Sequence, residues 1–425
     1  MTTTRPPLKP LDAALAELLA FATVLDGVES VSTFDADGRV LARAVVSELH
    51  VPPQDNSSMD GYAVRCADVQ QAQLQIDGVL PITQRIAAGA SGAPLAPMSA
   101  ARIFTGAPLP PGADAVVMQE DCEFLPNTDG TPPNPVLAGG RVRIKQVPAL
   151  GQWIRRAGED VATGAEVLSK GERLTPAALG LAASIGMDQL PVVRRPRVAL
   201  CSTGDELVMP GEVPPGQMKP GTIYNSNRFF LRALLIRLGC EVSDLGIVPD
   251  RLDATVQALE KAAQHHDLIL TSGGVSVGEE DHIKPAVQSL GSLDLWQIAI
   301  KPGKPFAYGR VKNAHFIGLP GNPVSSFVTF LLLVRPFLLK LQGVTRVAPS
   351  SIVIPAHFTW ARGDKRQEFL RARRNAAGGL DLFSTQSAGV LTSAVWGDGL
   401  VDNPPGQTIQ HGDLVRFIPF TEVLG

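Results

Sequence analysis

Residues that can bind a phosphate and a metal ion are concentrated in a Gly/Ser loop that follows an apolar stretch. The run reads Leu268-Ile-Leu-Thr-Ser-Gly-Gly-Val-Ser-Val-Gly-Glu-Glu-Asp-His-Ile-Lys284. Backbone N–H groups of such a loop can donate to an anion, and its carboxylates can coordinate a divalent cation. We therefore expect this loop to bind part of an anionic ligand.

Two further segments repeat this pattern of strand, turn and polar residues. The first is Arg197-Val-Ala-Leu-Cys-Ser-Thr-Gly-Asp-Glu-Leu207. The second combines Ile300-Lys-Pro-Gly-Lys-Pro305 with Gly318-Leu-Pro-Gly-Asn-Pro-Val-Ser-Ser326. Together the three segments supply lysines, acids, hydroxyls and N–H donors, a mixture that suits a phosphate-bearing substrate with a divalent metal.

The elements around these segments predict an α/β domain. Strands expected at 197–201, 241–247 and 267–271 alternate with helices expected at 226–238, 253–265 and from 282. This alternation is typical of a doubly wound, mostly parallel sheet with helices on both faces, and such sheets bind ligands at the carboxyl ends of their strands. The three polar segments all follow such ends.

The rest of the chain is rich in turns and short strands. Residues 80–140 contain dense Gly/Pro signals around strands such as 115–118, and after Gly343 short strands are expected at 352–354, 368–372, 380–383 and 414–418. We predict an α/β multidomain protein with an N-terminal pair of β-rich domains and a C-terminal barrel-like β-domain. The expected ranges are 1–26 (a helix on the α/β domain), 27–55 with 140–176 (a linking β/α domain), 56–139 (a small β-domain), 177–342 (the α/β domain) and 343–425.

Composition excludes several classes of protein. The 425 residues are 44% hydrophobic and 19% charged with a net charge of −3, which argues against a dedicated nucleic-acid binder. The four cysteines have no metal-ligand spacing and are expected to be reduced thiols. Asp12 and Glu17 interrupt the apolar run from Leu11, which therefore predicts an amphipathic helix and not a signal peptide. We find no stretch of about 18 continuous apolar residues, so we expect a cytoplasmic protein that does not enter membranes.

Seven motifs in order give the chain a specific resemblance. The motifs are Asp55-Asn-Ser-Ser-Met-Asp-Gly-Tyr-Ala-Val64, Ile103-Phe-Thr-Gly-Ala-Pro-Leu-Pro110, Arg155-Arg-Ala-Gly-Glu-Asp160, Ser202-Thr-Gly-Asp-Glu-Leu207, Ser272-Gly-Gly-Val-Ser-Val-Gly278, Ile300-Lys-Pro-Gly-Lys-Pro305 and Gly318-Leu-Pro-Gly-Asn-Pro-Val324. With these motifs the chain resembles the molybdopterin molybdenumtransferase family, whose animal member is gephyrin.

The resemblance implies a reaction and partners. Adenylylated molybdopterin and molybdate would give molybdenum cofactor and AMP, with a divalent cation, usually Mg²⁺. The family forms an elongated homodimer of four-domain subunits. The upstream adenylyltransferase and acceptor molybdoenzymes are possible further partners.

Candidate site residues follow from the motifs and from the chemistry of phosphoanhydride cleavage, which needs charge neutralisation and fixed donors. Glu206, Asp250 and Asp281 are candidate metal ligands, and Lys301 and Lys304 would neutralise phosphate or molybdate oxygens. The loop donors would be Ser272, Gly273, Gly274 and Ser276.

Further residues match functional positions of the family. Asp60, Thr105 and Asp160 match residues thought to face the other subunit, and with Glu206 and Asp281 they form the candidate catalytic set. Arg371 matches an arginine that helps to bind molybdate, and Ser325 lies where that site uses a hydroxyl. Which of Asp60, Glu206 and Asp281 would activate water stays open.

Three positions depart from the family pattern. Asn225 stands where many relatives have an acid, His282 where an aromatic residue or threonine is common, and Ala388 at a usual hydroxyl position. Asn225 can form hydrogen bonds but holds a cation less strongly than a carboxylate does.

Ordinary structural roles compete with the functional ones. Asp60 and Asp160 could be turn residues, Glu206 a helix cap, and Lys301 and Lys304 solvated lysines. Arg371 could lie with Arg373 and Arg374 on a solvated strand face. Two other functions also stay open: a molybdopterin adenylyltransferase, although the two additional β-domains argue against it, and a non-catalytic scaffold of the gephyrin type.

Overall fold

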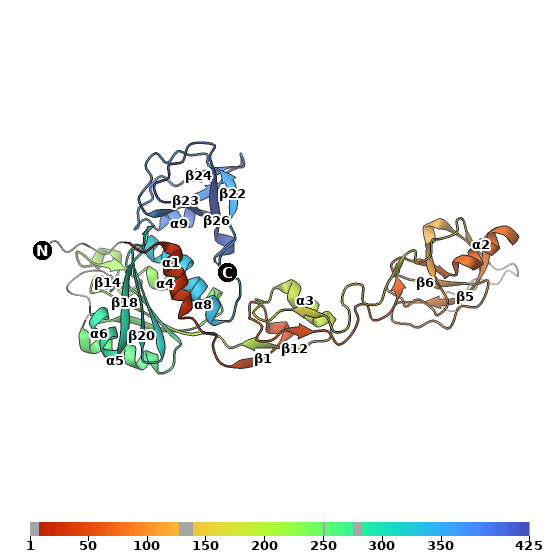
Figure 1. Cartoon of the computed structure of the whole chain (residues 1–425), viewed down its shortest axis with the longest axis horizontal. Coiled ribbons are helices and arrows are strands. Elements are labelled where there is room, and N and C mark those ends of the chain that lie inside the picture. The colour runs from red at the N-terminus through yellow and green to blue at the C-terminus, as the bar shows by residue number, and fades with distance from the viewer. Residues whose placement is uncertain (1–7, 127–138, 250, 275–281, 425) are drawn as a thin grey trace. The chain divides into compact units, whose positions relative to one another are not determined.

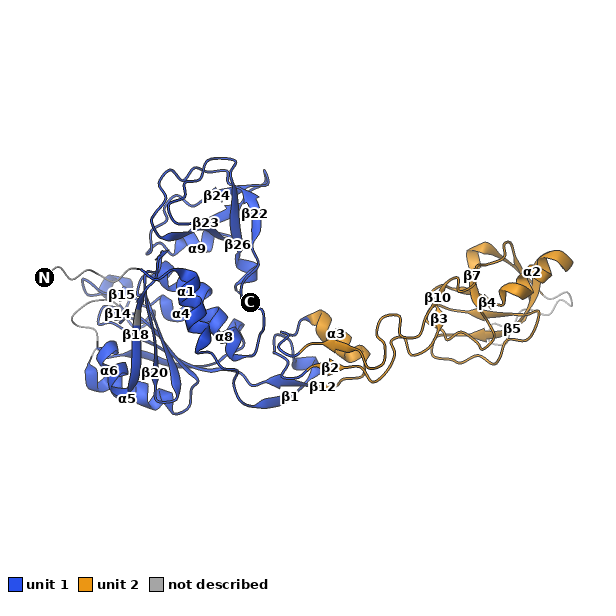
Figure 2. Cartoon of the chain, viewed as in Figure 1, with its two compact units in different colours: residues 1–43, 170–175, 190–425 blue, residues 44–169, 176–189 orange. Residues whose placement is uncertain are grey.

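The computed structural model describes residues 8–126, 139–249, 251–274 and 282–424. The chain forms two compact units (Figure 2). The first contains residues 1–43, 170–175 and 190–425, and the second contains residues 44–169 and 176–189.

A six-stranded sheet forms the centre of the first unit (Figure 1). Its first four strands are mutually parallel, whereas β20 is antiparallel to both of its neighbours. This confirms the mostly parallel sheet expected from the alternating pattern. The order is β16 (Glu241–Val248), β13 (Arg197–Thr203), β17 (Leu268–Ser272), β21 (Ala314–Leu319), β20 (Pro305–Val311) and β18 (Gly291–Gln297).

Helices cover both faces of this sheet because alternate strand residues point to opposite sides. Val198 and Leu200 pack in a cluster with residues of α1 (Leu11–Ala20), α4 (Asn227–Arg237) and the helices after β21. Ala199 and Cys201 pack in a second cluster with residues of α5 (Leu252–Ala263) and α6 (Ile283–Leu290). The doubly wound fold is therefore confirmed, and α1 belongs to it as expected.

The segment Pro323–Leu341 is helical throughout and unusually apolar. It consists of α7 (Pro323–Thr329), a π-helical turn η4 (Phe330–Val334) and α8 (Arg335–Leu341). Its mean hydropathy of 1.8 and its 19 residues would by themselves permit a membrane span, but 89% of it is buried within the protein. Such burial is that of a core helix, and Pro336 fits because it lies in the first turn of α8.

The C-terminal domain contains a second sheet, and one strand of this sheet comes from the segment that belongs to the α/β domain in sequence. Strand β19, at Ile300–Lys301, pairs in parallel with β23, so that Lys301 lies opposite Glu368. Strand β25 is fully buried and was not among the predicted strands. The order is β19, β23 (Gln367–Arg374), β25 (Gly399–Asn403), β26 (Leu414–Pro419) and β22 (Ile352–Pro355), with β24 (Leu380–Leu382) beside β23 and the short helix α9 (Thr392–Trp396) between β24 and β25.

Short pairings connect the elements between the domains. Strand β1 (Val28–Ser32) pairs with β12 (Gln189–Val193), so residues beyond 176 belong with the linking region and the α/β domain begins near Arg197 instead of at 177. Strand β2 (Val45–Val46) pairs with β11 (Glu166–Leu168), against which α3 (Pro176–Ser184) packs. The remaining short elements are β14 (Leu207–Val208), β15 (Ile223–Tyr224), η1 (Thr33–Asp35), η3 (Pro215–Gln217) and η5 (Phe420–Glu422).

The second unit contains the small β-domain. Strand β9 pairs with β5 and β8, so the sheet of this domain includes residues up to Ile144, beyond the expected end at 139. Helix α2 (Cys66–Gln75), which was not predicted, contributes Val69 and Ala72 to the core cluster of this sheet. The strand order is β7 (Ala115–Met118), β4 (Gly61–Val64), β6 (Ala100–Ile103), β5 (Val79–Ile86), β9 (Arg141–Ile144) and β8 (Cys122–Leu125); β3 (Asn56–Ser57), β10 (Ile154–Arg155) and η2 (Gln119–Asp121) complete the unit.

Candidate functional site

The carboxyl ends of three neighbouring strands lie in line. Ser202 of β13 is in register with Ser272 of β17, and Ser272 is in register with Leu319 of β21. The Gly/Ser loops that follow these strands therefore start side by side at one edge of the sheet, which is where a doubly wound fold binds ligands.

Asn227 fastens two of these loops to the start of α4. Its Nδ2 donates to Ser272 Oγ at 2.7 Å and to the Gly321 carbonyl oxygen at 2.7 Å. Asn227 was not among the predicted site residues. The available signal was the pair of asparagines in Asn225-Ser-Asn227, which lies at the start of a predicted helix.

Gly273 and Gly274 occupy positions that require glycine. Their φ angles are +94° and +69°, in the left-handed region that other residues rarely adopt. A Cβ on Gly273 would lie 2.9 Å from the Thr203 carbonyl oxygen, and one on Gly274 would lie 2.6 Å from Ile283 Cγ1. The backbone of the loop after β17 therefore passes close to the end of the neighbouring strand β13.

Several buried polar atoms at these strand ends have no hydrogen-bond partner among the described residues. Such atoms are rare in folded proteins and are usually satisfied by water or a ligand. Their concentration around one sheet edge leaves both donors and acceptors there that water or a polar ligand can satisfy. They are Ser202 Oγ, Thr203 Oγ1, Thr271 Oγ1, Asn225 Nδ2 and Asn227 Oδ1.

The predicted metal ligands are only partly covered by the described residues. Asp250, Asp281 and the loop donor Ser276 lie outside them. Glu206 is exposed, and its Oε2 lies so close to Gly204 that a Cβ there would be 2.4 Å away. Within the described ranges no three His, Cys, Asp or Glu residues form a metal-binding group. A carboxylate beside strand-end hydroxyls nevertheless offers the oxygen ligands that Mg²⁺ prefers.

The two predicted lysines differ in their surroundings. Lys301 Nζ lies 3.1 Å from Glu368 Oε1 and 3.4 Å from Asp364 Oδ2, so its charge is shared with carboxylates of the C-terminal domain. Lys304 is half-buried, and its ammonium has no ion-pair partner among the residues that the structure describes. Lys304 is thus the freer cation for an anionic ligand.

Ser325 is 5% exposed and lies in the first turn of α7. Its backbone oxygen would lie 3.5 Å from a Cβ on Gly303, so Ser325 approaches the loop that carries both lysines. The adjacent Val324 donates its N–H to the Ala388 carbonyl oxygen at 2.9 Å. These contacts bring the 301–304 loop, α7 and the segment at Ala388 together.

Arg371 is buried, with 1% of its surface exposed, whereas Arg373 and Arg374 are exposed. The alternative of a single solvated arginine face is therefore wrong. The Arg371 guanidinium donates to Ser393 Oγ at 3.1 Å and to the carbonyl oxygens of Phe369 and Ser387 at 3.0 and 3.3 Å. Burial lowers the pKa of Arg371 to about 10. In this arrangement Arg371 holds the 387–393 segment.

In the second unit, Asp60 and Thr105 form a pair. Asp60 Oδ1 accepts hydrogen bonds from the N–H and from Oγ1 of Thr105, both at 2.8 Å. These bonds, the backbone one first, lower the pKa of Asp60, and the positive charge of Arg102 adds to the effect. Arg102 Nη1 donates to the Gly61 carbonyl oxygen at 3.1 Å, next to Asp60. Asp60 is thus held in its ionised form.

Asp160 lies in a hollow of about 440 Å³ in the same unit. Its N–H donates to the Val51 carbonyl oxygen at 3.0 Å, and its side chain is exposed. Asn56, which also lines the hollow, carries a buried Oδ1 without a partner among the described residues. Among the described residues, no hydrogen bond joins Asp160 to the Asp60–Thr105 pair.

The cysteines are unpaired, as expected. Burial raises the pKa of Cys201 and of Cys240 to about 12, so both thiols stay protonated at neutral pH. Both side chains are buried and pack in the core of the α/β domain.

Comparison with known proteins assigns this arrangement to a family. Three family models match consecutive parts of the chain: "MoeA N-terminal region (domain I and II)" at residues 9–186, "Probable molybdopterin binding domain" at 199–340 and "MoeA C-terminal region (domain IV)" at 353–420. A molybdopterin molybdenumtransferase of Haemophilus influenzae is 43% identical over 334 residues, which cover 78% of each chain. The chain belongs to the molybdopterin molybdenumtransferase family.

Other relatives extend the match over nearly the whole chain. The molybdopterin molybdenumtransferase 2 of Mycobacterium tuberculosis is 38% identical over 379 residues, covering 87% of this chain and 89% of that protein. A crystal structure of the MoeA protein from Pyrococcus horikoshii is 31% identical with a TM-score of 0.76 and covers 97% of this chain and 99% of that one. A second, from the strain OT3, is 27% identical with a TM-score of 0.81. As a molybdopterin molybdenumtransferase family member, the chain is a transferase.

Proposed function

We propose that this protein transfers molybdenum from molybdate to adenylylated molybdopterin, giving molybdenum cofactor and AMP. The observation that carries the proposal is the set of polar atoms at the ends of β13 and β17 and the start of α4, beside the Gly273–Gly274 turn, that have no partner among the residues that the structure describes. A substrate with phosphate oxygens, hydroxyls and ring nitrogens can supply partners of both kinds. The names of the relatives support the transfer of molybdenum to molybdopterin.

Cleavage of the phosphoanhydride places negative charge on the phosphate oxygens. Donors fixed in advance stabilise such charge because they need no reorganisation during the reaction. Ser272, whose hydroxyl is fixed by Asn227, and the backbone N–H of Gly274 are such donors in our proposal. The Gly273 N–H instead donates to the Leu319 carbonyl oxygen at 3.0 Å, so Gly273 serves by its close backbone approach. Lys304 neutralises the anion, and Ser325 and the Lys301 side chain line the molybdate position. An ionised carboxylate, Asp60 among the candidates, accepts the proton of an attacking water.

We propose Mg²⁺ as the cation because carboxylate oxygens are the ligands that it prefers. Glu206, together with Asp250 and Asp281, would hold the cation, which when bound neutralises phosphate oxygens of the substrate. We further propose that the protein works in the cytoplasm as a homodimer, in which Asp60, Thr105 and Asp160 serve the partner's substrate.

AMP release from adenylylated molybdopterin tests the proposal. The purified chain is assayed with and without molybdate and Mg²⁺, and formation of active cofactor is followed in parallel. We expect release and cofactor formation to require both ions. Tight binding of the substrate without AMP release under any of these conditions would contradict the proposal and would favour a scaffold role.

A further inference from the structure

The Lys301 ammonium lies against a carboxylate that is entirely inside the protein. Glu368 is 0% exposed, and its Oε1 accepts from Lys301 Nζ at 3.1 Å. The parallel pairing of β19 with β23 places the two residues directly opposite each other. The contact therefore follows from the register of the sheet and not from a chance approach of two flexible side chains.

The other oxygen of Glu368 is fixed by three donors. Oε2 accepts from Trp360 Nε1 at 2.8 Å, from the Asp364 N–H at 3.2 Å and from Asn403 Nδ2 at 3.3 Å. These bonds orient the carboxylate so that Oε1 faces Lys301. A buried carboxylate requires such partners, since an uncompensated buried charge is strongly destabilising.

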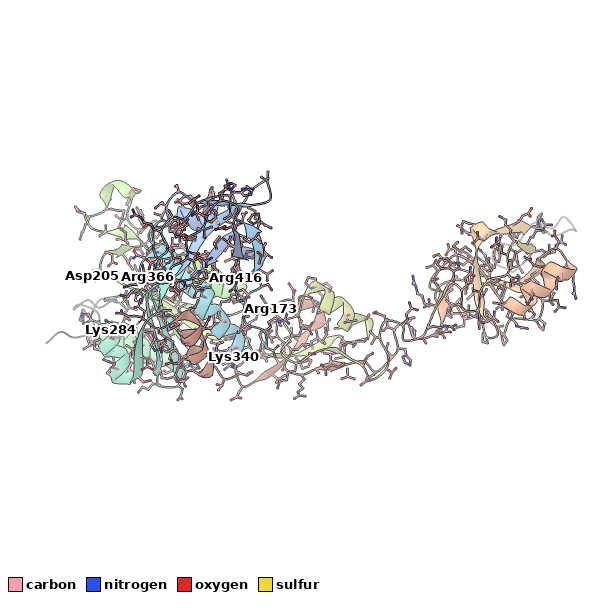
Figure 3. The ribbon with its side chains drawn as sticks, turned by 45° about the horizontal axis from the view of Figure 1, so that its top comes forward. Arg173, Asp205, Lys284, Lys340, Arg366 and Arg416 are labelled. Carbon is pink, nitrogen blue, oxygen red and sulfur yellow. The ribbon has the colours of Figure 1, made fainter. Side chains whose placement is uncertain are left out.

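Lys301 differs from Glu368 in that 37% of its side chain is exposed. The Lys301 side chain is therefore held by Glu368 on its buried side and is open to solvent on its other side. The neighbouring Asp364 has its own cation, because Arg366 Nη2 lies 2.8 Å from Asp364 Oδ2. Figure 3 labels Arg366 in the C-terminal domain, directly before β23. Asp364 Oδ2 also lies 3.4 Å from Lys301 Nζ, so Glu368, at 3.1 Å, is the nearer of the two carboxylates beside this ammonium.

We propose that Glu368 is a positioning residue for molybdate. Its carboxylate fixes the Lys301 ammonium, and with it the 301–304 loop, at the place where the anion binds. This inference rests on the proposed function, because it takes molybdate as the ligand of this loop. It assigns the C-terminal domain a role in anion affinity that is separate from the buried Arg371.

Glu368→Gln tests the inference with an almost isosteric change. The three donors around Oε2 require an acceptor there, so the glutamine carbonyl oxygen must take that place and its NH₂ group must face Lys301. Two donors then oppose each other, and Asp364, whose Oδ2 lies 3.4 Å from the ammonium, is the carboxylate that remains beside it. The ammonium is therefore displaced from Glu368 toward Asp364. Loss of a charge-assisted hydrogen bond predicts a rise of about tenfold in KM for molybdate, with kcat for AMP release changed by less than about twofold.

Asp402→Asn is the matched control. Asp402 is also a buried carboxylate of this sheet, with 7% of its surface exposed. Its partners are Gln367, whose Nε2 donates to it at 2.5 Å, and Arg416 (labelled in Figure 3), and they do not include Lys301. We expect this variant to keep the KM for molybdate of the wild type. An equal rise of KM in both variants would reveal general loosening of the sheet and overturn the inference.

Glu368→Asp supplies a second measurement. It keeps the charge but retracts the carboxylate by one methylene, so KM for molybdate is expected to rise by about threefold, between the wild type and Glu368→Gln. A wild type that ignores molybdate would overturn the proposed function and this inference with it. If the wild type responds to molybdate but the Glu368 variants keep its KM for molybdate, the role of Glu368 is overturned and the proposed function stands.

Discussion

Asn227 Nδ2 lies 2.7 Å from Ser272 Oγ, although 45 positions separate the two residues in the chain. The same nitrogen donates to the Gly321 carbonyl oxygen, so one amide at the start of α4 fixes the loops after β17 and β21. The proposed phosphate donors are thus positioned by a residue that belongs to none of the loops itself.

Replacing Asn227 by alanine should loosen both loops. The change leaves the Ser272 hydroxyl and the Gly321 oxygen without their donor, which should lower the free energy of unfolding by about 1–3 kcal/mol and weaken substrate binding. Denaturant unfolding and the KM for adenylylated molybdopterin measure the two effects. Asn313→Ala, at an exposed turn between β20 and β21, is the control and should change neither. Unchanged KM in Asn227→Ala would contradict the positioning role.

Gly273 can be compared with a glycine of nearly equal conformation. Gly273 has φ +94° and Gly412 has φ +95°, but a Cβ on Gly412 would meet no atom within 4 Å, whereas one on Gly273 would meet the Thr203 oxygen at 2.9 Å. Both alanine variants carry the cost of a left-handed residue, about 1–2 kcal/mol. Gly273→Ala should be less stable than Gly412→Ala in thermal unfolding and should alone lose substrate affinity. Equal behaviour of the two variants would show that the close approach is unimportant.

Thr105→Val should raise the pKa of Asp60. The variant keeps the backbone N–H bond but removes the hydroxyl bond, one of the causes that lower this pKa. Because the folded-state pKa is lowered, the contribution of Asp60 to stability is present above its unfolded pKa and is lost as the pH falls through the folded pKa. In Thr105→Val this contribution should be smaller, and its loss should be complete at a higher pH than in the wild type.

An NMR titration of the Asp60 carboxyl carbon measures that shift. Asp253 is an internal reference, because Arg251 and not Thr105 lowers its pKa. If Asp60 is the base that accepts a proton, the acid limb of kcat/KM should move to higher pH together with the titration. Movement of the titration without the acid limb would remove Asp60 from that role.

Arg371→Leu should act mainly on stability. The variant leaves the carbonyl oxygens of Phe369 and Ser387 and the Ser393 hydroxyl without donors, which predicts a loss of about 2–4 kcal/mol in the free energy of unfolding. Arg374→Leu, on an exposed position of the same strand, should stay within about 0.5 kcal/mol of the wild type. Chemical denaturation compares them. A stable Arg371→Leu protein that has lost molybdate dependence would instead support direct binding of the anion.

Local patterns were sufficient to predict the α/β domain. Strands 197–201 and 267–271 and helices 226–238 and 253–265 were predicted close to their observed bounds because hydrophobic periodicity and Gly239 mark them within a few residues. Helices and strands that lack a clear hydrophobic period or a terminating glycine were not predicted. Helix α2 is polar along much of its length, and β25 is a five-residue strand buried on both faces, for which no alternation exists.

The sequence by itself determined which loops can bind an anion, because Gly, Ser and acidic residues after an apolar strand carry that chemistry wherever the strand lies. The tertiary structure decided which of these groups are free to act. The pairing of β19 with β23 brings Lys301 and Glu368 together although 67 positions separate them in the chain. The packing of the C-terminal domain buries Arg371, whose guanidinium donates to three acceptors. Such partners are set by sheet register and core packing between distant segments, and neither can be read from neighbouring residues.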